Sequence, residues 1–351
     1  MNSILGQTWG DIEVLIMDDC SPDGTAEVAR QFEDSRVRYV RNKTNVGALG
    51  NYNKGIRLSR GKYVWLISAD DYLRVPYVLE RYLQLMEKHP RVAYAFCPAV
   101  SVQNGKETGL LEYSTYGESD RVVPGSVFLK TLLHRNVVVA PTAMARRDCY
   151  ERISYFPLNP KWNGTSIDLI WGGDWYLWCM FALHAEVGYL ADPMVCYREH
   201  DSCSTNTVTK HRLTNCFHAE AGVPWQIKKC ADAAGDTELS RECLHAASRV
   251  YADHLTTKQY RTAASTVTMD QVENSLCGYT MSESERRYIR AQIFVDMGDN
   301  FYQRGDFPSA KRSYLAAADL LPGMLTARAK SVLLSLGKTG KYLRQTAARR
   351  R

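Results

Sequence analysis

The sequence predicts an α/β fold, with a mainly parallel, twisted sheet followed by an α-helical C-terminal region. Two observations support this prediction. In the first part of the chain, short apolar runs alternate with helical patterns, as in a series of β-α-β units. From about residue 206 onward the strand signals stop, and residues 286–347 have the pattern of paired helices. We therefore expect two regions, residues 1–205 and 206–351.

The expected elements of the first region follow in order along the chain. The strands are short apolar runs at residues 12–17, 37–40, 63–67, 92–96 and, in a less regular stretch, 137–140. The helices are expected at residues 2–7, after the turn at 21–25, within 45–59, and at 76–89, where the apolar residues share one face. Thr25 is the candidate N-cap of the second helix.

The C-terminal region contains one recognisable helix hairpin. Gly305, Asp306, Phe307, Ala310 and Pro322 resemble a tetratricopeptide-like unit. Arrays of such hairpins need about three repeats for stability, and the sequence offers one convincing unit. We therefore expect this hairpin to pack on the preceding domain rather than to form a free binding array.

Composition narrows the class of protein. With 351 residues, of which 45% are apolar and 23% charged, the chain is typical of globular proteins that bury a full core. Its ten cysteines, without a CxxC pair, indicate reduced thiols and hence a cytoplasmic protein. The sequence has no signal peptide and no apolar run of membrane-spanning length, so any membrane association is expected to be peripheral.

The net charge of +6 is unevenly distributed along the chain. No acidic residue follows Asp319, whereas eight Lys and Arg residues do. Two interpretations stay open: a solvated basic tail, or peripheral contact of the basic C-terminus with an anionic membrane face. Nucleic acid is not expected as a partner, because no nucleic-acid motif or interleaved aromatic pattern accompanies the charge.

Two pairs of adjacent aspartates are the strongest functional signal. Asp18-Asp19 and Asp70-Asp71 each follow an apolar run that is typical of a buried parallel strand. Ligands of open α/β sheets bind just outside the carboxyl ends of the strands. Two carboxylate pairs at that edge repel each other, and a divalent cation with a phosphate ligand offsets this repulsion. The pairs therefore predict a site for a metal ion and a phosphate compound.

Six motifs, taken in order, resemble those of the family 2 glycosyltransferases, which have the Rossmann-like GT-A fold. The matching segments are residues 7–14, 18–25, 45–47 with 53–56, 61–71, 173–178 and 197–200. The resemblance covers roughly residues 3–205. It implies an inverting, metal-dependent hexosyltransferase that uses Mn²⁺ or Mg²⁺. The sugar would pass from a nucleoside diphosphate donor, with uridine favoured, to a hydroxyl of a glycan or lipid-linked acceptor in cell-surface polysaccharide synthesis.

The resemblance implies nucleotide contacts at the first aspartate pair and the loop after the second strand. Asp19 matches the family aspartate that accepts a hydrogen bond from the nucleotide base, and Asp18 precedes it. For both carboxylates the alternative is capping of the following turn. Asn45 and Gly47 would let the backbone pass close to the nucleotide.

The second aspartate pair and a distant histidine match the family's metal site. Asp70, Asp71 and His200 are the implied ligands, with Asp70 also at the nucleotide, and Arg198 is assigned to phosphate. The alternatives are an Asx-type turn for the aspartates, an exposed loop position for His200 and a structural ion pair for Arg198.

Asp174 matches the acidic residue that removes the acceptor's hydroxyl proton while the oxygen attacks the anomeric carbon. Its alternative role is a helix N-cap. Trp162, Trp171 and Trp175 are candidates for stacking on sugar rings, although core packing is the more frequent role of such residues.

The sequence departs from the family pattern in three places. Ser68 stands where the first aspartate of the metal motif is common, and Gly173 stands where a glutamate is usual. The chain also begins inside the first expected helix, without the strand and nucleotide-contacting loop that come before it in the family. A truncated fragment, a misassigned start and a differently closed sheet are all consistent with this beginning.

Two other functions stay open. A nucleotidyltransferase also uses acidic metal sites on such a sheet, but it predicts a glycine-rich, basic phosphate loop near the start, which the sequence lacks. A non-catalytic scaffold, derived from a glycosyltransferase and binding a partner through its helical region, is slightly favoured by Ser68 and Gly173. Metal-dependent nucleotide binding would distinguish the enzymes from the scaffold.

Overall fold

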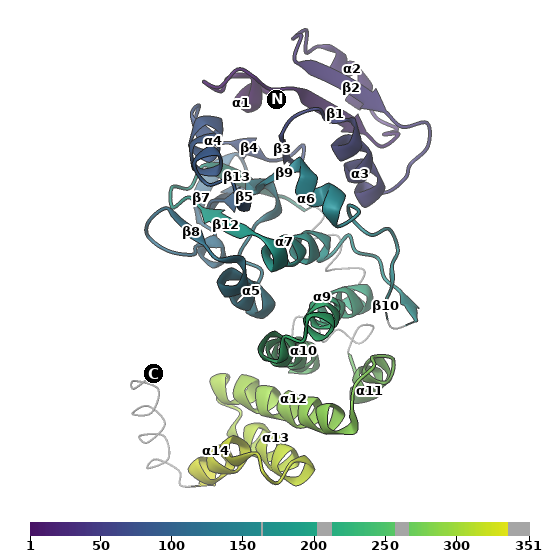
Figure 1. The fold of residues 1–351 in the computed structure, drawn as a ribbon, viewed down its shortest axis with the longest axis vertical. Helices are drawn as coiled ribbons and strands as arrows, with labels where there is room; N and C mark the ends of the chain where they lie inside the picture. The colour runs from purple at the N-terminus through teal and green to yellow at the C-terminus, as the bar shows by residue number, and fades with distance from the viewer. Residues whose placement is uncertain (163, 202–212, 257–266, 336–351) are drawn as a thin grey trace. The chain divides into compact units, whose positions relative to one another are not determined.

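The computed structural model describes residues 1–162, 164–201, 213–256 and 267–335 of the chain (Figure 1). It contains two compact units, which are residues 1–160 with 167–211, and residues 161–166 with 212–351. The first unit is α/β and the second is almost entirely helical, so the predicted α/β class with an α-helical C-terminal region is confirmed. The predicted division at residue 205 falls between described residues and stays a prediction.

The core of the first unit is a five-stranded mixed sheet. Its order is β3-β9-β5-β12-β8, formed by Tyr63–Trp65, Met144–Arg146, Val92–Phe96, Glu186–Tyr189 and Arg121–Val123. The strands β3, β5 and β12 run in one direction, while β9 and β8 run the opposite way. All five residues of β5 are buried, which places this strand at the centre of the core. The predicted mainly parallel sheet thus corresponds to β3, β5 and β12, and the antiparallel strand β9 lies between β3 and β5.

Two smaller sheets complete the strand pairing of the first unit, and the antiparallel pair β10-β11, Lys161–Trp162 with Thr165–Ser166, belongs to the second unit. The parallel pair β1-β2 consists of Val14–Asp18 and Val37–Arg41. A four-stranded sheet in the order β4-β13-β6-β7 consists of Tyr72–Leu73, Val195–Glu199, Ala99–Gln103 and Lys106–Leu110. Parallel pairing of β13 with β6 carries residues 198–200 beside the chain that follows β3.

The helices of the first unit largely follow the predicted pattern. They are α1 to α7, formed by Asn2–Leu5, Thr25–Arg30, Ala48–Leu58, Val78–Lys88, Gly125–His134, Arg147–Arg152 and Gly173–His184. Two short 3₁₀ turns are η1, Glu112–Ser114, and η2, Ala140–Thr142. The apolar face predicted for α4 is buried against the sheet through Val78, Leu79, Tyr82 and Met86.

Two predictions of local structure were wrong. Thr25 is the first residue of α2 rather than its N-cap, because its backbone N–H and hydroxyl both bond to Asp23. Residues 137–139 are buried but form no strand, and the strand here is β9. The Val138 N–H bonds to the Asn136 side chain at 3.2 Å, and Pro141 in η2 has no N–H to offer a ladder.

Consecutive arginines at the end of β9 donate hydrogen bonds to carbonyls at the C-termini of two different helices. Arg146 donates to the Val92 carbonyl at 2.7 Å and to the Met86 carbonyl, in the last turn of α4, also at 2.7 Å. Arg147 donates to the carbonyl of Ser59, the C-cap of α3, at 2.9 Å. Cations at helix C-termini satisfy carbonyls that lack a partner within the helix.

The second unit is built from six helices in its described part. They are α9 to α14, formed by Leu213–Ala234, Thr237–Thr256, Met269–Cys277, Glu283–Gln303, Phe307–Leu320 and Leu325–Ser335; α8 is not among the described elements. Capping boxes begin α11 at Thr268 and α12 at Ser282. Stacking of Trp225 on Tyr279, with ring centroids 4.3 Å apart, marks the centre of its core.

The predicted hairpin corresponds to α12 and α13. Tyr314 of α13 lies against Gly298 of α12, where a Cβ atom would come within 2.4 Å of the tyrosine ring. Asp306 caps α13 by accepting the Ser309 N–H. Its tetratricopeptide character and its packing on the first unit stay predictions. In the part of the chain that the structure describes, no helix has the length and apolar character needed to cross a bilayer.

Candidate active site

The carboxylate of Asp18 is bound on both sides by its neighbours at the end of β1. One oxygen accepts the Ser21 N–H at 2.8 Å, and the other accepts the Tyr39 hydroxyl and Arg41 Nη1, the latter at 2.7 Å. Burial acts to raise the pKa of Asp18, but these hydrogen bonds and the Arg41 charge outweigh it and lower the pKa to about 2. Asp18 is only 3% exposed, so its contacts are those of a brace between β1 and β2.

Asp19 turns toward the loop that precedes α3. Its Oδ1 accepts the Asn42 side-chain amide at 2.8 Å and the Val46 N–H at 2.9 Å. The buried Asn42 also donates to the Asn51 side chain at 2.9 Å and accepts from Lys54 Nζ at 2.6 Å. Asp19 therefore belongs to a polar network that joins β1, the 42–47 loop and α3.

The loop beside Asp19 depends on a glycine. Gly47 is the N-cap of α3, with φ +79° and ψ 158°, a backbone conformation that side chains other than glycine rarely adopt. Its N–H bonds to the Asn45 side chain at 3.0 Å. Asn45 and Gly47 thus shape an exposed loop next to Asp19, as the nucleotide prediction requires.

The second aspartate pair meets the end of β13. His200 Nε2 lies 3.0 Å from Asp70 Oδ2, and the Arg198 N–H donates to Asp71 Oδ1 at 2.9 Å. The Arg198 side chain also donates to the Asp70 carbonyl through Nε. The four residues predicted for metal and phosphate are therefore neighbours, although they come from segments about 130 residues apart in the sequence.

The Asp71 carboxyl group is held in an unfavourable environment for its charge. Burial raises its pKa to about 7, and the neighbouring Asp70 charge adds to the effect. The Arg198 N–H, the Arg198 charge and His200 oppose the shift without cancelling it. A buried carboxyl next to a second carboxylate is a site where a cation would be stabilising.

The donor chemistry of this cluster suits a hard divalent cation, but its geometry offers few ligands. Asp70 and His200 lie in contact with each other, and Asp71 Oδ1 accepts the Arg198 N–H. Among the described residues, no group of three or more His, Cys, Asp and Glu side chains is placed to hold a metal ion. Protein ligands here would therefore be few, with substrate oxygens completing the coordination, as is common for Mg²⁺.

Asp174 lies in the first turn of α7. The helix begins after Gly172, which has φ +80°, and the Asn136 side-chain amide donates to Asp174 Oδ2 at 3.4 Å. Burial raises the pKa of Asp174, while the Trp175 N–H and Asn136 lower it without cancelling the shift. A carboxylate whose pKa is raised is a stronger proton acceptor, which is the property that a general base needs.

Tyr52 of α3 connects the two halves of the site. Burial raises the pKa of its phenol, Ser68 lowers it through a hydrogen bond, and the charges of Asp70, Asp174 and Asp71 raise it further. The predicted base and the predicted metal ligands thus act on one side chain. The structure does not bring Asp18 into this group.

Four residues of this region were missed by the sequence analysis, namely Asn42, Asn51, Tyr52 and Asn136. None belongs to a local motif, because each contacts a segment distant in the sequence. One signal was available. Asparagine is unfavourable inside helices, so Asn51 and Asn53 in a predicted helix indicated a specific role for their side chains.

The predicted sugar-stacking tryptophans are mostly core residues. Trp175 is 8% exposed and donates to the Leu132 carbonyl at 2.8 Å. Trp162 is buried in the second unit, where its ring lies over Gly222 of α9. Trp171 is half-buried. Tyr52 and Tyr113 lie closer to this role, because burial raises the pKa values of both phenols and the Asp174 charge adds to both shifts.

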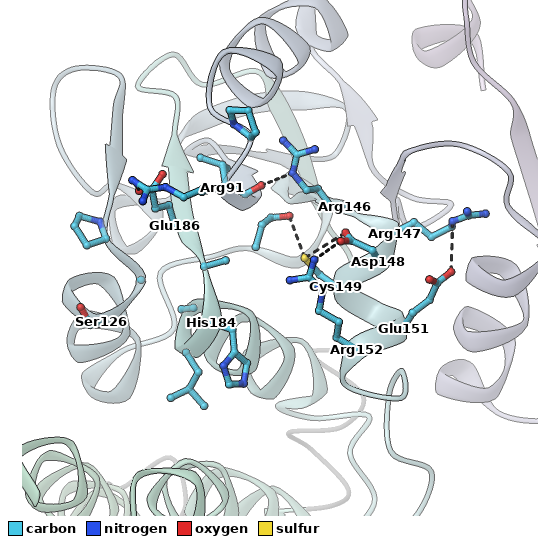
Figure 2. A pocket seen from close by; sticks show the side chains of 18 of the residues that line it. Arg91, Ser126, Arg146, Arg147, Asp148, Cys149, Glu151, Arg152, His184 and Glu186 are labelled. Carbon is cyan, nitrogen blue, oxygen red and sulfur yellow. Dashed lines mark hydrogen bonds and ion pairs between the residues drawn. The ribbon is translucent and has the colours of Figure 1, made fainter. Parts of the chain in front are cut away.

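A cavity of about 760 Å³ lies away from this site, at the amino ends of β5 and β12 (Figure 2). Its lining includes several arginines, but these are engaged within the protein. Arg91 pairs with Glu186 at 2.5 Å, Arg152 pairs with Asp148 at 2.5 Å, and Arg146 bonds to main-chain carbonyls. The predicted residues lie at the carboxyl ends of the strands, so this cavity is not part of the candidate site.

Comparison with known proteins finds a family match in the first unit. Residues 1–153 match the family model "Glycosyl transferase family 2". The resemblance found in the sequence is thereby confirmed for this segment. It covers the aspartate pairs but ends before Asp174, Arg198 and His200.

Curated relatives of this chain are glycosyltransferases by name. An uncharacterized glycosyltransferase of Nostoc sp. is 27% identical over 206 residues, which is 57% of this chain and 59% of the relative. One from Haemophilus influenzae is 34% identical over 99 residues, 28% of this chain and 33% of the relative. A UDP-Glc:alpha-D-GlcNAc-diphosphoundecaprenol beta-1,3-glucosyltransferase of Escherichia coli is 35% identical over 72 residues, 20% of this chain and 29% of the relative. The chain spans well under two thirds of these relatives.

Among solved structures, the chain is similar to a mannosyltransferase from Pyrobaculum calidifontis in complex with GDP-Man and Mn²⁺. The TM-score is 0.46 at 14% sequence identity, covering 97% of this chain and 80% of the mannosyltransferase.

Proposed function

We propose that this protein is an inverting, metal-dependent glycosyltransferase. It would move a sugar from a nucleoside diphosphate donor to a hydroxyl of a glycan or lipid-linked acceptor. The observation that carries the proposal is the meeting of the Asp70–His200 contact and the raised pKa of Asp174 around Tyr52, in a unit whose first 153 residues match family 2.

The donor nucleotide is assigned to the loop beside Asp19. Asp19 Oδ1 is occupied by Asn42 and Val46, and its Oδ2 is the atom assigned to the nucleotide base. A carboxylate oxygen accepts the imide N–H of uracil, which supports a uridine nucleotide. The name of the Escherichia coli relative, which includes UDP-Glc and a diphosphoundecaprenol acceptor, supports the same donor and a lipid-linked acceptor.

The diphosphate is assigned to the second aspartate pair. Asp70, Asp71 and His200 would hold Mn²⁺ or Mg²⁺, which when bound neutralises the charge that develops on the departing diphosphate. Arg198 would add a charge-assisted hydrogen bond to a phosphate oxygen. Replacing Asp70, Asp71 or His200 should weaken donor binding, because the cation that they would hold offsets the charge of the diphosphate.

Transfer itself is assigned to Asp174. Its carboxylate would take the acceptor's hydroxyl proton while that oxygen forms a bond to the anomeric carbon. The bond from this carbon to the diphosphate breaks on the opposite face, and its electron pair leaves with the diphosphate. The configuration at the anomeric carbon is therefore inverted.

The pathway and the cellular location of the reaction are predictions. The proposed role is cell-surface polysaccharide synthesis in the cytoplasm. Most of the basic residues after Asp319 lie beyond residue 335, outside the described part of the chain, and their peripheral membrane contact is untested.

The first experiment measures the melting temperature with UDP and Mn²⁺, separately and together, with GDP and Mn²⁺ as comparison. Ligands that bind the native state raise the melting temperature by mass action. We expect a shift that requires both UDP and Mn²⁺ and is lost in Asp70→Ala. Asp148→Ala, a half-exposed carboxylate at the other edge of the sheet, is the matched control and should keep the shift.

A second measurement separates binding from catalysis. Asp174→Asn should keep the UDP–Mn²⁺ shift but lose UDP release from UDP-glucose by about 10³-fold, because a positioned base contributes 10²- to 10⁴-fold to rate. Absence of any nucleotide shift, or unchanged turnover in Asp174→Asn, would contradict the proposal. A stoichiometric protein partner without nucleotide binding would support the scaffold alternative.

A further inference from the structure

We propose that Asn136 is a positioning residue that holds the Asp174 carboxylate in one orientation at the start of α7. Asn136 lies two residues after the end of α5, at His134, and is not part of any motif found in the sequence. The role concerns a contact between the segment that follows α5 and the start of α7, rather than a contact with substrate. Its catalytic consequence rests on the proposed role of Asp174 as the base.

The orientation of the Asn136 amide is fixed by the backbone. Its Oδ1 accepts the Val138 N–H at 3.2 Å, which assigns the oxygen to that side of the amide. The amide nitrogen then faces Asp174 Oδ2, at 3.4 Å. An N–H donor toward a carboxylate stabilises its charged form and restricts its rotation.

The helix before Asn136, α5, is joined to α7 next to this contact. The Trp175 indole N–H, adjacent to Asp174, donates to the Leu132 carbonyl in the last turns of α5 at 2.8 Å. Residues Val137 and Val138 are 0% and 1% exposed, so the chain that carries Asn136 is anchored in the core. Asn136 therefore approaches Asp174 from a rigid support, which a positioning contact requires.

Three kinds of group surround Asp174. The N-terminus of α7 favours the carboxylate, and the N–H of Trp175 bonds to it. The phenols of Tyr52 on α3 and Tyr113 on η1 lie close enough for its charge to raise their pKa values. Asn136 supplies the side-chain hydrogen bond that lowers the pKa of Asp174.

Asn136→Asp is the sharpest test, because it preserves shape and the acceptor for Val138 while placing a second carboxylate beside Asp174. Like charges in contact raise the pKa of one member. The Asp174 carboxyl is followed by ¹³C NMR of protein labelled at aspartate, with its signal identified as the one lost in Asp174→Asn. We expect its apparent pKa to rise by at least one unit in Asn136→Asp and by less in Asn136→Ala.

Asn104→Asp, at the exposed turn between β6 and β7, is the matched control and should leave the Asp174 signal unchanged. Melting curves of all variants identify any that fail to fold, and Asn136→Ala then carries the test. An Asp174 pKa within 0.3 units of wild type in the folded variants would overturn the proposal.

UDP release from UDP-glucose provides the catalytic readout. The acidic limb of the kcat profile should move upward with the pKa in Asn136→Asp, and kcat in Asn136→Ala should fall by about 10-fold with the UDP–Mn²⁺ melting shift intact. If Asp174→Asn leaves turnover unchanged, the proposed base fails whatever the NMR result. If Asp174→Asn is inactive while the profile of Asn136→Asp does not move, only the role of Asn136 fails.

Discussion

The two aspartate pairs have the same sequence pattern and opposite electrostatics. Asp18, at the end of β1, is fully hydrogen-bonded and its pKa is lowered to about 2. Asp71, after β3, has one hydrogen-bond donor in the Arg198 N–H and its pKa is raised to about 7. Asp18 and Asp71 are both buried, so burial alone does not explain the difference between their pKa values.

The cause lies in what each strand end faces. Parallel pairing of β1 with β2 puts Arg41 directly opposite Asp18 in register, so a cation and a phenol are supplied by the neighbouring strand. Asp71 instead faces a main-chain N–H and lies beside Asp70. The electrostatics of an aspartate after a strand therefore depend on the groups that the neighbouring segments place beside it, not on the sequence pattern.

Removing Asp18 should have the largest effect on stability. Asp18→Ala takes away three hydrogen bonds and leaves Arg41 without its carboxylate, for an expected loss of about 2–3 kcal/mol in the free energy of unfolding. Asp70→Ala removes a partly exposed pair with His200 and should cost less than about 1 kcal/mol. Urea denaturation of both variants measures the difference, and equal losses would contradict the comparison.

The loop beside Asp19 gives the next effect. Gly47→Ala forces a Cβ into a backbone region that is essentially limited to glycine, at an expected cost of about 1–2 kcal/mol. Gly10→Ala is the control, since its φ is ordinary and its added Cβ meets no atom within 4 Å. Urea denaturation reports both variants. A neutral Gly47→Ala would mean that the loop adopts another conformation.

The pH dependence of stability should differ in sign between Asp71 and Asp18. In metal-free buffer, Asp71 binds a proton more tightly when folded, so its contribution to stability declines as pH rises from about 4 through 7. Asp18 binds its proton less tightly when folded, so its contribution is lost as pH falls from about 4 to 2.

Each slope is at most about 1.4 kcal/mol per pH unit, the value for one proton. Asp71→Asn should flatten the fall between pH 4 and 7, and Asp18→Asn should flatten the fall at acid pH. Denaturation at a series of pH values measures both. Exchange of the two behaviours between the variants would refute the assignment of the pKa shifts.

Local patterns were sufficient to predict most elements near the site. The apolar runs before Asp18 and Asp70 are the strands β1 and β3, and the apolar face of residues 76–89 is that of α4. The strand predicted at residues 137–140 was wrong because an apolar run indicates burial rather than a strand. The Val138 N–H bonds to the Asn136 side chain and is not available to a neighbouring strand. Thr25 misled because capping depends on which carboxylate lies nearby, here Asp23.

The candidate site could be predicted only where family motifs carried it. Asp70, Asp71, Arg198 and His200 were named from two motifs, and the structure brings them together. The different condition of Asp18 and Asp71 depends on strand register and long-range contacts, which no local pattern encodes. Tyr52 and Asn136 owe their positions to long-range packing around α3, α5 and α7, which no local pattern marks.

Three consecutive residues of α3 contact three separate parts of the first unit. The Asn51 amide donates to the Met17 carbonyl in β1. Tyr52 forms a hydrogen bond with Ser68, which precedes the second aspartate pair. The Asn53 side-chain amide donates to the Phe156 carbonyl and accepts the Phe156 N–H. Successive side chains of a helix point about 100° apart, so one turn of α3 reaches three different segments of the first unit. Insertion of a single residue within α3 before Asn51 would rotate these side chains away from all three contacts, whereas an insertion in the exposed 43–46 loop would leave the contacts in place.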